Sequence, residues 1–307
     1  MSLPRRMCVF ATCQSNRKSC SMRQSSVTSE GYRYSSTFAA GRLFDAVYVI
    51  NLDRRPDRWE FATQQLSRAG FLHEEYVRFP AVDGRNVDLQ KAHACGLISR
   101  LGLLRLQEPE HRRIWGMDLN PGAVGCALSH ALLWAQIAAS RHRSVLVVED
   151  DSLFPQDFHH KYEARTKQVP SDWELLYVSG LDTAGQAPQL RVAEGVCRVP
   201  QMHRTTNCYV VSHRGARLLL DACFPVTYQL DTMMTLRTAG DGAGGVPYVT
   251  VPNCYTLQPP LVVQATRMGS DIQSVSGGVC DRDEVEEERA RCRAAGWEVQ
   301  ETGTLVP

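Results

Sequence analysis

Val145-Leu146-Val147-Val148-Glu149-Asp150-Asp151 is the stretch that decides the fold of this chain of 307 residues. Four consecutive apolar residues predict a strand that is buried on both faces, as the strands of parallel sheets are. Three carboxylates follow directly where this strand ends. Because ligands of open α/β sheets bind at the carboxyl ends of the strands, the stretch predicts a ligand site at an acidic sheet edge.

Strands and helices alternate on either side of this stretch. Buried strands are predicted at 46–50, 76–82, 144–148, 173–179 and 207–211. Helices are predicted from Pro56 and Pro121, because proline suits the first turn of a helix, and over 214–222 and 232–239. The weakly patterned residues 84–120 predict a helical insertion. This alternation is typical of an α/β fold with a mainly parallel central sheet flanked by helices.

Two flanking segments differ from this domain, which we expect to span 43–279. Residues 1–42 are rich in serine and basic residues, which is typical of a disordered or targeting-like segment. Residues 280–307 are expected to form a charged tail. The glycine-rich loop at 240–245 is not a dinucleotide fingerprint, because no strand leads into it and no helix follows.

Composition excludes several classes of protein. The net charge is +1, so charge favours no nucleic-acid partner, and no run reaches the roughly 18 apolar residues of a membrane span. We therefore expect no nucleic-acid partner and no transmembrane segment. The eleven cysteines contain no CxxC pair, which argues against a zinc ribbon or a thioredoxin-like site, and we expect them to be mostly reduced. The compartment stays open.

The acidic strand end has the composition of a metal site. Closely spaced carboxylates repel one another, and Mn²⁺ or Mg²⁺, which prefer carboxylate and phosphate oxygens, would relieve that repulsion. Glu149 and Asp151 share a face in extended geometry, so we predict that they are the metal ligands. A solvated acidic turn is the alternative. A phosphoacceptor receiver domain is excluded, because residues 194–200 lack the second aspartate that it needs.

A second chemical segment, residues 49–59, contains three arginines where a strand gives way to a helix. These are Arg54, Arg55 and Arg58. Guanidinium groups pair well with phosphate oxygens, and a helix N-terminus adds backbone donors, so the segment suits a diphosphate. The alternative is a surface cluster in which the arginines pair with Asp53 and Asp57.

A third segment, residues 122–134, leads from small residues into a helix. Gly122 and Gly125 allow a ligand to approach the backbone closely, and the helix carries Ser129 and His130. A histidine that only packs in the core is the alternative. Cys126, in apolar surroundings, is expected to pack as a small hydrophobic residue.

These segments resemble, in their order, glycosyltransferase family 25, which includes lipooligosaccharide β-galactosyltransferases and procollagen galactosyltransferases. The order is Asn-Leu-Asp-Arg-Arg-Pro-Asp-Arg at 51–58, Phe-Pro-Ala-Val-Asp-Gly at 79–84, Gly-Cys-Ala-Leu-Ser-His at 125–130, and the acidic strand end. Segments at 206–216, 230–234, 259–264 and 270–272 continue the resemblance, which therefore runs from Ala46 to Asp271.

The resemblance implies a GT-A-type fold and an inverting, metal-dependent transfer of a hexose, typically galactose, from a UDP-sugar to a hydroxyl of a glycan or protein acceptor. It also implies a role for each matching residue. The nucleotide would contact Asn51, Leu52, Arg54 and Arg58, its base or ribose would lie near Asp83 and Gly84, the donor would face Ser129 and His130, and Mn²⁺ (or Mg²⁺) would bind Glu149 and Asp151.

An inverting transfer also needs a base that takes the acceptor's proton. Asp231 is our candidate, with Asp182 as the second choice and a plain helix N-cap as the alternative for Asp231. Asn207 and Cys208 replace the small residues that usually precede Tyr209, which leaves the acceptor open. Two other classes also stay open. One is a catalytically inactive relative that binds a glycan or partner, and the other is a nucleotidyltransferase.

Overall fold

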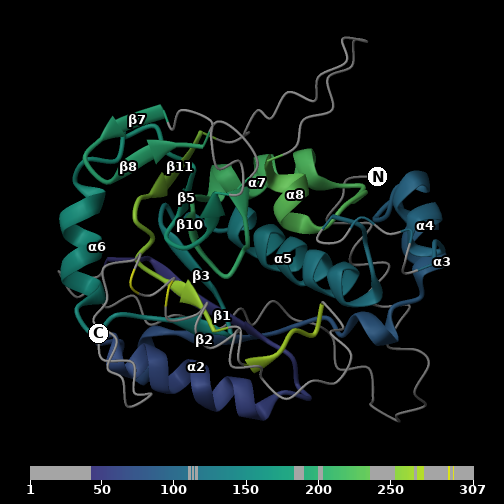
Figure 1. The fold of residues 1–307 in the computed structure, drawn as a ribbon, viewed down its shortest axis with the longest axis horizontal. Coiled ribbons are helices and arrows are strands. Elements are labelled where there is room, and N and C mark those ends of the chain that lie inside the picture. The colour runs from purple at the N-terminus through teal and green to yellow at the C-terminus, as the bar shows by residue number, and fades with distance from the viewer. Residues whose placement is uncertain are drawn as a thin grey trace.

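The computed structural model describes residues 43–109, 112, 114, 117–182, 190–199, 203–235, 253–265, 268–272, 290 and 293. The predictions for residues 1–42 and 240–245, and for the tail apart from residues 290 and 293, lie outside this part of the chain. Within it, the predicted α/β fold with a central sheet between helices is confirmed (Figure 1).

The central sheet has eight strands in the order β2-β1-β3-β10-β5-β11-β8-β7. Parallel pairing joins β2, β1 and β3, and also β5 and β11, while the other neighbours pair antiparallel. The strands, in sheet order, are Val77–Pro80, Ala46–Asn51, Val145–Glu149, Cys208–Val211, Leu175–Tyr177, Cys254–Leu257, Val196–Arg198 and Leu190–Ala193. The parallel part, β2-β1-β3, is the part that carries the chemical segments.

Seven α-helices are described around this sheet, and short elements complete the fold. The helices are α2 (Pro56–Arg68), α3 (Leu89–Ala94), α4 (Arg100–Leu106), α5 (Pro121–Ala139), α6 (Phe158–Thr166), α7 (His213–Cys223) and α8 (Leu230–Thr235). Two 3₁₀ turns and two small sheets accompany them: η1 (His73–Glu75), η2 (Gly84–Asn86), β4 (Ser152–Leu153) with β12 (Val263–Gln264), and β6 (Leu181–Asp182) with β9 (His203–Arg204). The helical insertion predicted at 84–120 is thus confirmed by η2, α3 and α4.

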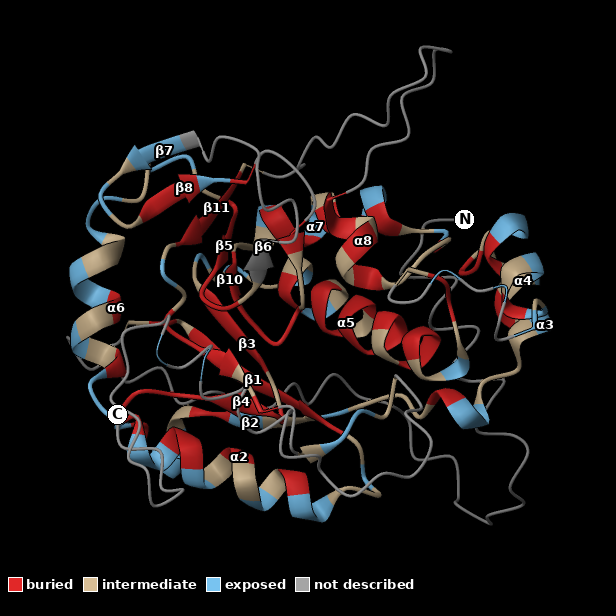
Figure 2. Cartoon of the chain, in the orientation of Figure 1, coloured by how far each residue is buried: buried red, intermediate tan, exposed pale blue. Residues whose placement is uncertain are grey.

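The central sheet separates two apolar cores, because successive side chains of a strand point to opposite faces. In β1, Ala46, Tyr48 and Ile50 belong to the core that contains α5, α7 and α8, while Val47 and Val49 belong to the core that contains α2 and α6. Figure 2 shows buried residues along the central strands and exposed residues on the outer sides of α2 and α6. Burial on both faces explains why these strands are continuously apolar.

The two helices that border the site begin where local chemistry predicts. Pro56 occupies the first turn of α2, and Pro121 that of α5. The side chain of Asn120 accepts a hydrogen bond from the backbone N–H of Ala123 and caps α5. Strand β3 ends at Glu149, so Asp151 lies in a turn and not in the extended geometry that the sequence analysis assumed.

Helix α5 is the one described helix that is long and apolar enough to cross a membrane. In the fold, 61% of its apolar window is buried, and it packs against the sheet and α7. Buried core helices commonly have this composition, because they are apolar on all sides. The expectation that the chain has no transmembrane segment therefore stays a prediction.

Candidate active site

An open pocket lies at the carboxyl ends of β1 and β3 and collects residues from all three chemical segments. Most of the residues predicted for the donor and the metal line it together: Leu52, Arg54, Arg58, Asp83, Gly84, Ser129, His130, Glu149 and Asp151. The two motifs on which the functional reading depends, the arginine-led turn and the acidic strand end, therefore share one cavity.

Arg58 joins these two motifs directly. Its Nη2 lies 2.5 Å from Oδ2 of Asp151, and its Nε lies 2.8 Å from Oδ1 of Asp150, at an angle too poor for a hydrogen bond. Burial raises the pKa of Asp150 to about 6 and also raises the pKa of Asp151, although Arg58 opposes both shifts. The acidic strand end is therefore buried and partly neutralised by a guanidinium group, and it is not a solvated turn.

Asn51 reaches the site through Asp150. Its Nδ2 donates to Oδ2 of Asp150 at 2.6 Å, and its Oδ1 accepts from Nε of Arg78 at 2.8 Å. The side chain is buried and does not line the pocket. In this structure Asn51 holds the acidic turn against the end of β1.

Glu149 is the last residue of β3 and the first carboxylate of the acidic strand end. Its Oε1 accepts from Oγ1 of Thr206 at 2.5 Å and lies 3.1 Å from Nε2 of His130. Burial alone would raise the pKa of Glu149, but the hydrogen bonds from His130 and Thr206 hold it below the usual value. Thr206 lies two residues before the antiparallel strand β10, which pairs with β3 and so brings the residues that lead into it to this edge.

His130 is buried between Glu149 and an aromatic pair. Its Nδ1 lies 2.8 Å from the hydroxyl of Tyr209, which also accepts from Nε1 of Trp134 at 2.7 Å. Because the Tyr209 hydroxyl already accepts a hydrogen bond from the Trp134 N–H, we infer that it donates its own proton to Nδ1 of His130. Nε2 then carries the proton that points to Glu149.

Asp271 closes the pocket from the C-terminal side. Its carboxylate lies 2.6 Å from Nη1 of both Arg54 and Arg55 and 3.3 Å from Nη1 of Arg58. Burial opposes ionisation, but Arg54 and Arg55 together hold the pKa of Asp271 below its usual value. The three arginines therefore already share one carboxylate in this structure.

Two glycines bring α5 against the turn that follows β2. A Cβ on Gly84 would overlap the carbonyl oxygen of Pro121, and a Cβ on Gly125 would lie 2.5 Å from the carbonyl oxygen of Val82. Ser129 fastens the same contact, because its Oγ accepts from the backbone N–H of Val82 at 2.8 Å and donates to the Gly125 carbonyl at 2.7 Å. The pocket wall beside Asp83 therefore consists of backbone, because the start of α5 packs directly against the turn after β2.

Asp231 lies at the start of α8 and does not line the pocket. Its Oδ2 accepts from the backbone N–H of Thr205 at 3.2 Å and lies 3.8 Å from Nη1 of Arg204. Burial raises its pKa, and its charge helps to raise the pKa of the Cys126 thiol, which does line the pocket. Asp182 lies in β6, which pairs with β9.

Comparison with known proteins agrees with this geometry. The family model described as "Glycosyltransferase family 25 (LPS biosynthesis protein)" matches residues 44–234, well over half of the chain. The chain belongs to glycosyltransferase family 25. The match contains β1, α2, α5 and β3, and therefore both motifs that meet at Arg58.

Relatives within family 25 share about a third of the aligned residues. The chain is 31% identical to procollagen galactosyltransferase 1 of Danio rerio over 193 residues, which cover 58% of this chain and 29% of that protein. It is 32% identical to a glycosyltransferase 25 family member of Aedes aegypti over 181 residues, covering 57% and 28%. It is 31% identical to a probable inactive glycosyltransferase 25 family member 3 of Bos taurus over 182 residues, covering 58% and 29%. The chain thus spans less than a third of the length of these relatives.

The sequence predicted no part in this site for four of its residues, and one of them, Cys126, lines the pocket where it was expected only to pack as a small hydrophobic residue. Thr206, Gln264 and Asp271 reach it from segments distant in sequence, and Gln264 does so by donating to Oδ2 of Asp151 at 3.1 Å. Cys126 lines the pocket one helical turn before His130, and that four-residue spacing is the one signal that could have indicated it. Five cysteines in the described part of the chain are free thiols, namely Cys95, Cys126, Cys208, Cys223 and Cys254.

Proposed function

We propose that this chain is a metal-dependent, inverting hexosyltransferase that moves galactose from UDP-galactose to a hydroxyl of a glycan or protein acceptor. One observation carries the proposal, namely that the arginine-led turn and the acidic strand end line a single pocket in a family 25 fold. A nucleotide diphosphate needs both, because its phosphates bind guanidinium groups and its charge must be balanced.

The charge of the pocket supports the involvement of a cation. Three arginines line it, namely Arg54, Arg58 and Arg85, whereas five carboxylates line it: Asp83, Glu149, Asp150, Asp151 and Asp271. This lining carries up to two negative charges, so a diphosphate would be repelled without an added cation. A divalent ion of the Mn²⁺ or Mg²⁺ type reverses that balance, since these ions prefer carboxylate and phosphate oxygens.

Oxygen ligands for such an ion are available. Oδ1 of Asp151 is buried and has no hydrogen-bond partner, which is costly unless a cation or water meets it. Together with Glu149, the first carboxylate of the acidic strand end, Asp151 would hold the ion beside the arginines. When bound, the ion would stabilise the negative charge that develops on the departing diphosphate.

The protein's own residues would bind and orient the donor. Arg54 and Arg58 would bind the diphosphate through their guanidinium groups. The diphosphate would first displace the carboxylate of Asp271, because the same N–H donors cannot bind both anions fully. The base and ribose would lie against the backbone wall at Asp83 and Gly84, and the apolar side chain of Leu52 would help to exclude water.

Asp231 is the base in this proposal. Burial raises its pKa, which suits a carboxylate that accepts a proton near neutral pH. Two backbone N–H groups, from Thr205 and Thr232, fix its orientation. It is close enough to the pocket for its charge to help raise the pKa of the Cys126 thiol, which burial raises most.

A screen of UDP-sugars with Mn²⁺ tests the proposal. UDP release is measured with and without glycan and hydroxylysine-peptide acceptors, for the full chain and for Asp151→Asn. We expect acceptor-dependent release from UDP-galactose that EDTA abolishes and that Asp151→Asn lowers by at least about 100-fold, as loss of one preorganised electrostatic group does. Release that persists in EDTA would contradict the metal role. Donor binding without any transfer would favour the inactive binding protein, and release that no acceptor accelerates would favour hydrolysis or nucleotidyl transfer.

A further inference from the structure

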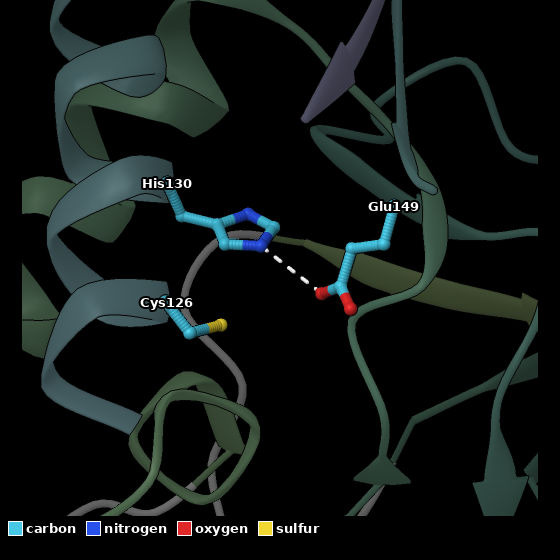
Figure 3. Close-up of side chains that lie close together, drawn as sticks. All are labelled: Cys126, His130 and Glu149. Carbon is cyan, nitrogen blue, oxygen red and sulfur yellow. Dashed lines mark hydrogen bonds and ion pairs between the residues drawn. The ribbon is translucent and has the colours of Figure 1, made fainter. Parts of the chain in front are cut away.

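Cys126 and His130 are one turn apart on α5, and both side chains point towards Glu149 at the end of β3 (Figure 3). One ligand atom from each residue, the Cys126 sulfur, a His130 ring nitrogen and a Glu149 carboxylate oxygen, lies within 4.8 Å of the other two. Thr206 supports the arrangement, because its hydroxyl donates to Oε1 of Glu149 at 2.5 Å and so orients that carboxylate.

This set differs chemically from a site made of carboxylates alone. Thiolate and imidazole are ligands that suit Zn²⁺ and Co²⁺, whereas Mg²⁺, Ca²⁺ and Mn²⁺ favour oxygen. Catalytic zinc sites typically have three protein ligands and leave a fourth position open. The three residues here, one of each ligand type, match that number, and all three line the open pocket.

We propose that Cys126, His130 and Glu149 form a three-ligand site for a thiophilic divalent cation of the zinc class. The site goes beyond the proposed sugar transfer, since binding of the cation needs neither donor nor acceptor. It shares Glu149 with the pair Glu149 and Asp151, but it replaces the second carboxylate by sulfur and nitrogen. Binding exchanges the thiol proton of Cys126, which passes to solvent, for a sulfur–metal bond.

The surroundings of His130 suit a metal ligand. A metal-bound histidine usually donates its second ring N–H to a fixed acceptor, which orients the ring. A metal at Nε2 requires the tautomer in which Nδ1 carries the proton, so on binding the imidazole proton moves from Nε2 to Nδ1. The Tyr209 hydroxyl, 2.8 Å from Nδ1, then changes from donor to acceptor, because its oxygen can accept from His130 and from Trp134 together. Nε2 then faces Glu149 as a free ligand atom.

The contraction that binding requires is small. A tetrahedral zinc ion with bonds of about 2.0–2.3 Å holds its ligand atoms roughly 3.3–3.8 Å apart. The widest separation here is at most 4.8 Å, so the site must tighten by about an ångström. A side-chain rotation of Cys126 provides such a movement, because that residue is only partly buried and borders open space.

Cobalt absorption tests the site, because a cysteine thiolate bound to Co²⁺ gives a ligand-to-metal charge-transfer band and four-coordinate Co²⁺ gives strong visible bands. The full chain is freed of metal and titrated with Co²⁺ under reducing conditions. We expect a saturable charge-transfer band that Zn²⁺ displaces. Cys126→Ser should remove this band and weaken Zn²⁺ binding by at least about 100-fold. That is the largest loss usually seen when a residue that only hydrogen-bonds to a metal ligand is replaced, so a direct ligand should cost at least as much.

Two matched variants sharpen this experiment. Cys95→Ser replaces a partly buried thiol outside the pocket and should keep the full band. Asp151→Asn should also keep the band while it loses Mn²⁺-supported transfer, which separates this inference from the proposed function. A band of equal intensity in the unchanged chain and in Cys126→Ser, or no band in either, would overturn the site.

A second measurement keeps the inference falsifiable if Cys126→Ser does not fold. X-ray absorption at the zinc edge of the unchanged chain, loaded with one equivalent of Zn²⁺, should show one sulfur neighbour at about 2.3 Å with nitrogen and oxygen neighbours at about 2.0–2.2 Å. Loading Cys95→Ser in the same way should give the same spectrum. A shell of nitrogen and oxygen alone would overturn the proposal.

Discussion

Nη2 of Arg58 lies 2.5 Å from Oδ2 of Asp151, at the point where α2 meets the turn after β3. Both side chains are less than 10% exposed, and Asp150 shares the same guanidinium group at 2.8 Å. The contact ties the arginine-led turn to the acidic strand end, so one buried ion-pair network both stabilises the fold and shapes the pocket.

Replacing Arg58 by alanine should destabilise the chain strongly. The substitution leaves Asp150 and Asp151 buried without their cation, and breaking a buried pair in this way costs about 3–5 kcal/mol. Urea unfolding measures the free energy. Lys167→Ala, which breaks an exposed pair with Glu163, should give no resolvable change. Equal stability of the two variants would contradict a buried network.

Replacing Tyr209 by phenylalanine should cost about 1–3 kcal/mol, because the Trp134 N–H and the Nδ1 of His130 lose their buried partner. Tyr177 is an equally buried tyrosine, and among the residues that the structure describes its hydroxyl has one hydrogen-bond partner, the sulfur of Met234 at 3.9 Å. Tyr177→Phe should therefore cost clearly less. If the two variants unfold at the same urea concentration, the hydrogen bonds to Tyr209 do not stabilise the site as argued.

Replacing Gly84 by alanine should cost at least about 3 kcal/mol, the upper range of overpacking, because the new methyl group overlaps the carbonyl of Pro121 and pushes α5 away. UDP binding should be lost with it. Gly70→Ala is the control, since its Cβ meets only the His159 ring, at 3.6 Å, and its positive φ of 91° costs about 1–2 kcal/mol. A Gly84→Ala chain that binds UDP normally would argue against the close backbone wall.

Replacing Asp83 by asparagine should change how stability depends on pH. Hydrogen bonds from Arg85, with Arg54 assisting, lower the pKa of Asp83 from 3.8 to about 2. A lowered pKa in the folded state stabilises the fold above the unfolded value, and this stabilisation is lost as the pH falls from about 4 to about 2. Unfolding free energies of the two chains should differ by about 1 kcal/mol above pH 4, allowing for solvent screening, and converge towards pH 2. A difference that does not change with pH would contradict the ion pair.

Replacing Asp231 by asparagine should lower the transfer rate by about 10²–10⁴-fold, the usual contribution of a general base. UDP binding should stay unchanged, because Asp231 does not line the pocket. Asp182→Asn, which tests the second choice, should transfer at nearly the unchanged rate. The opposite result, loss in Asp182→Asn alone, would move the base to Asp182.

The sequence by itself determined the elements that build the site. The apolar run before Glu149 and the prolines at 56 and 121 predicted β3, α2 and α5, because burial on both faces and the geometry of a helix start are local properties of a chain. The rule that ligands bind at the carboxyl ends of parallel strands then predicted the acidic edge and its arginines as one site.

Only the tertiary structure decided which partners complete that site. Strand β10 runs antiparallel between β3 and β5 and so brings Thr206 to Glu149, and residues 268–272 return from the end of the fold to put Asp271 among the arginines. The four-residue spacing of Cys126 and His130 puts both on one face of α5, but this helix is apolar on nearly every side, so the sequence could not show that this face meets Glu149. Strand order and the face that a uniformly apolar helix presents depend on how the whole chain buries its surface, and local sequence patterns do not contain that information.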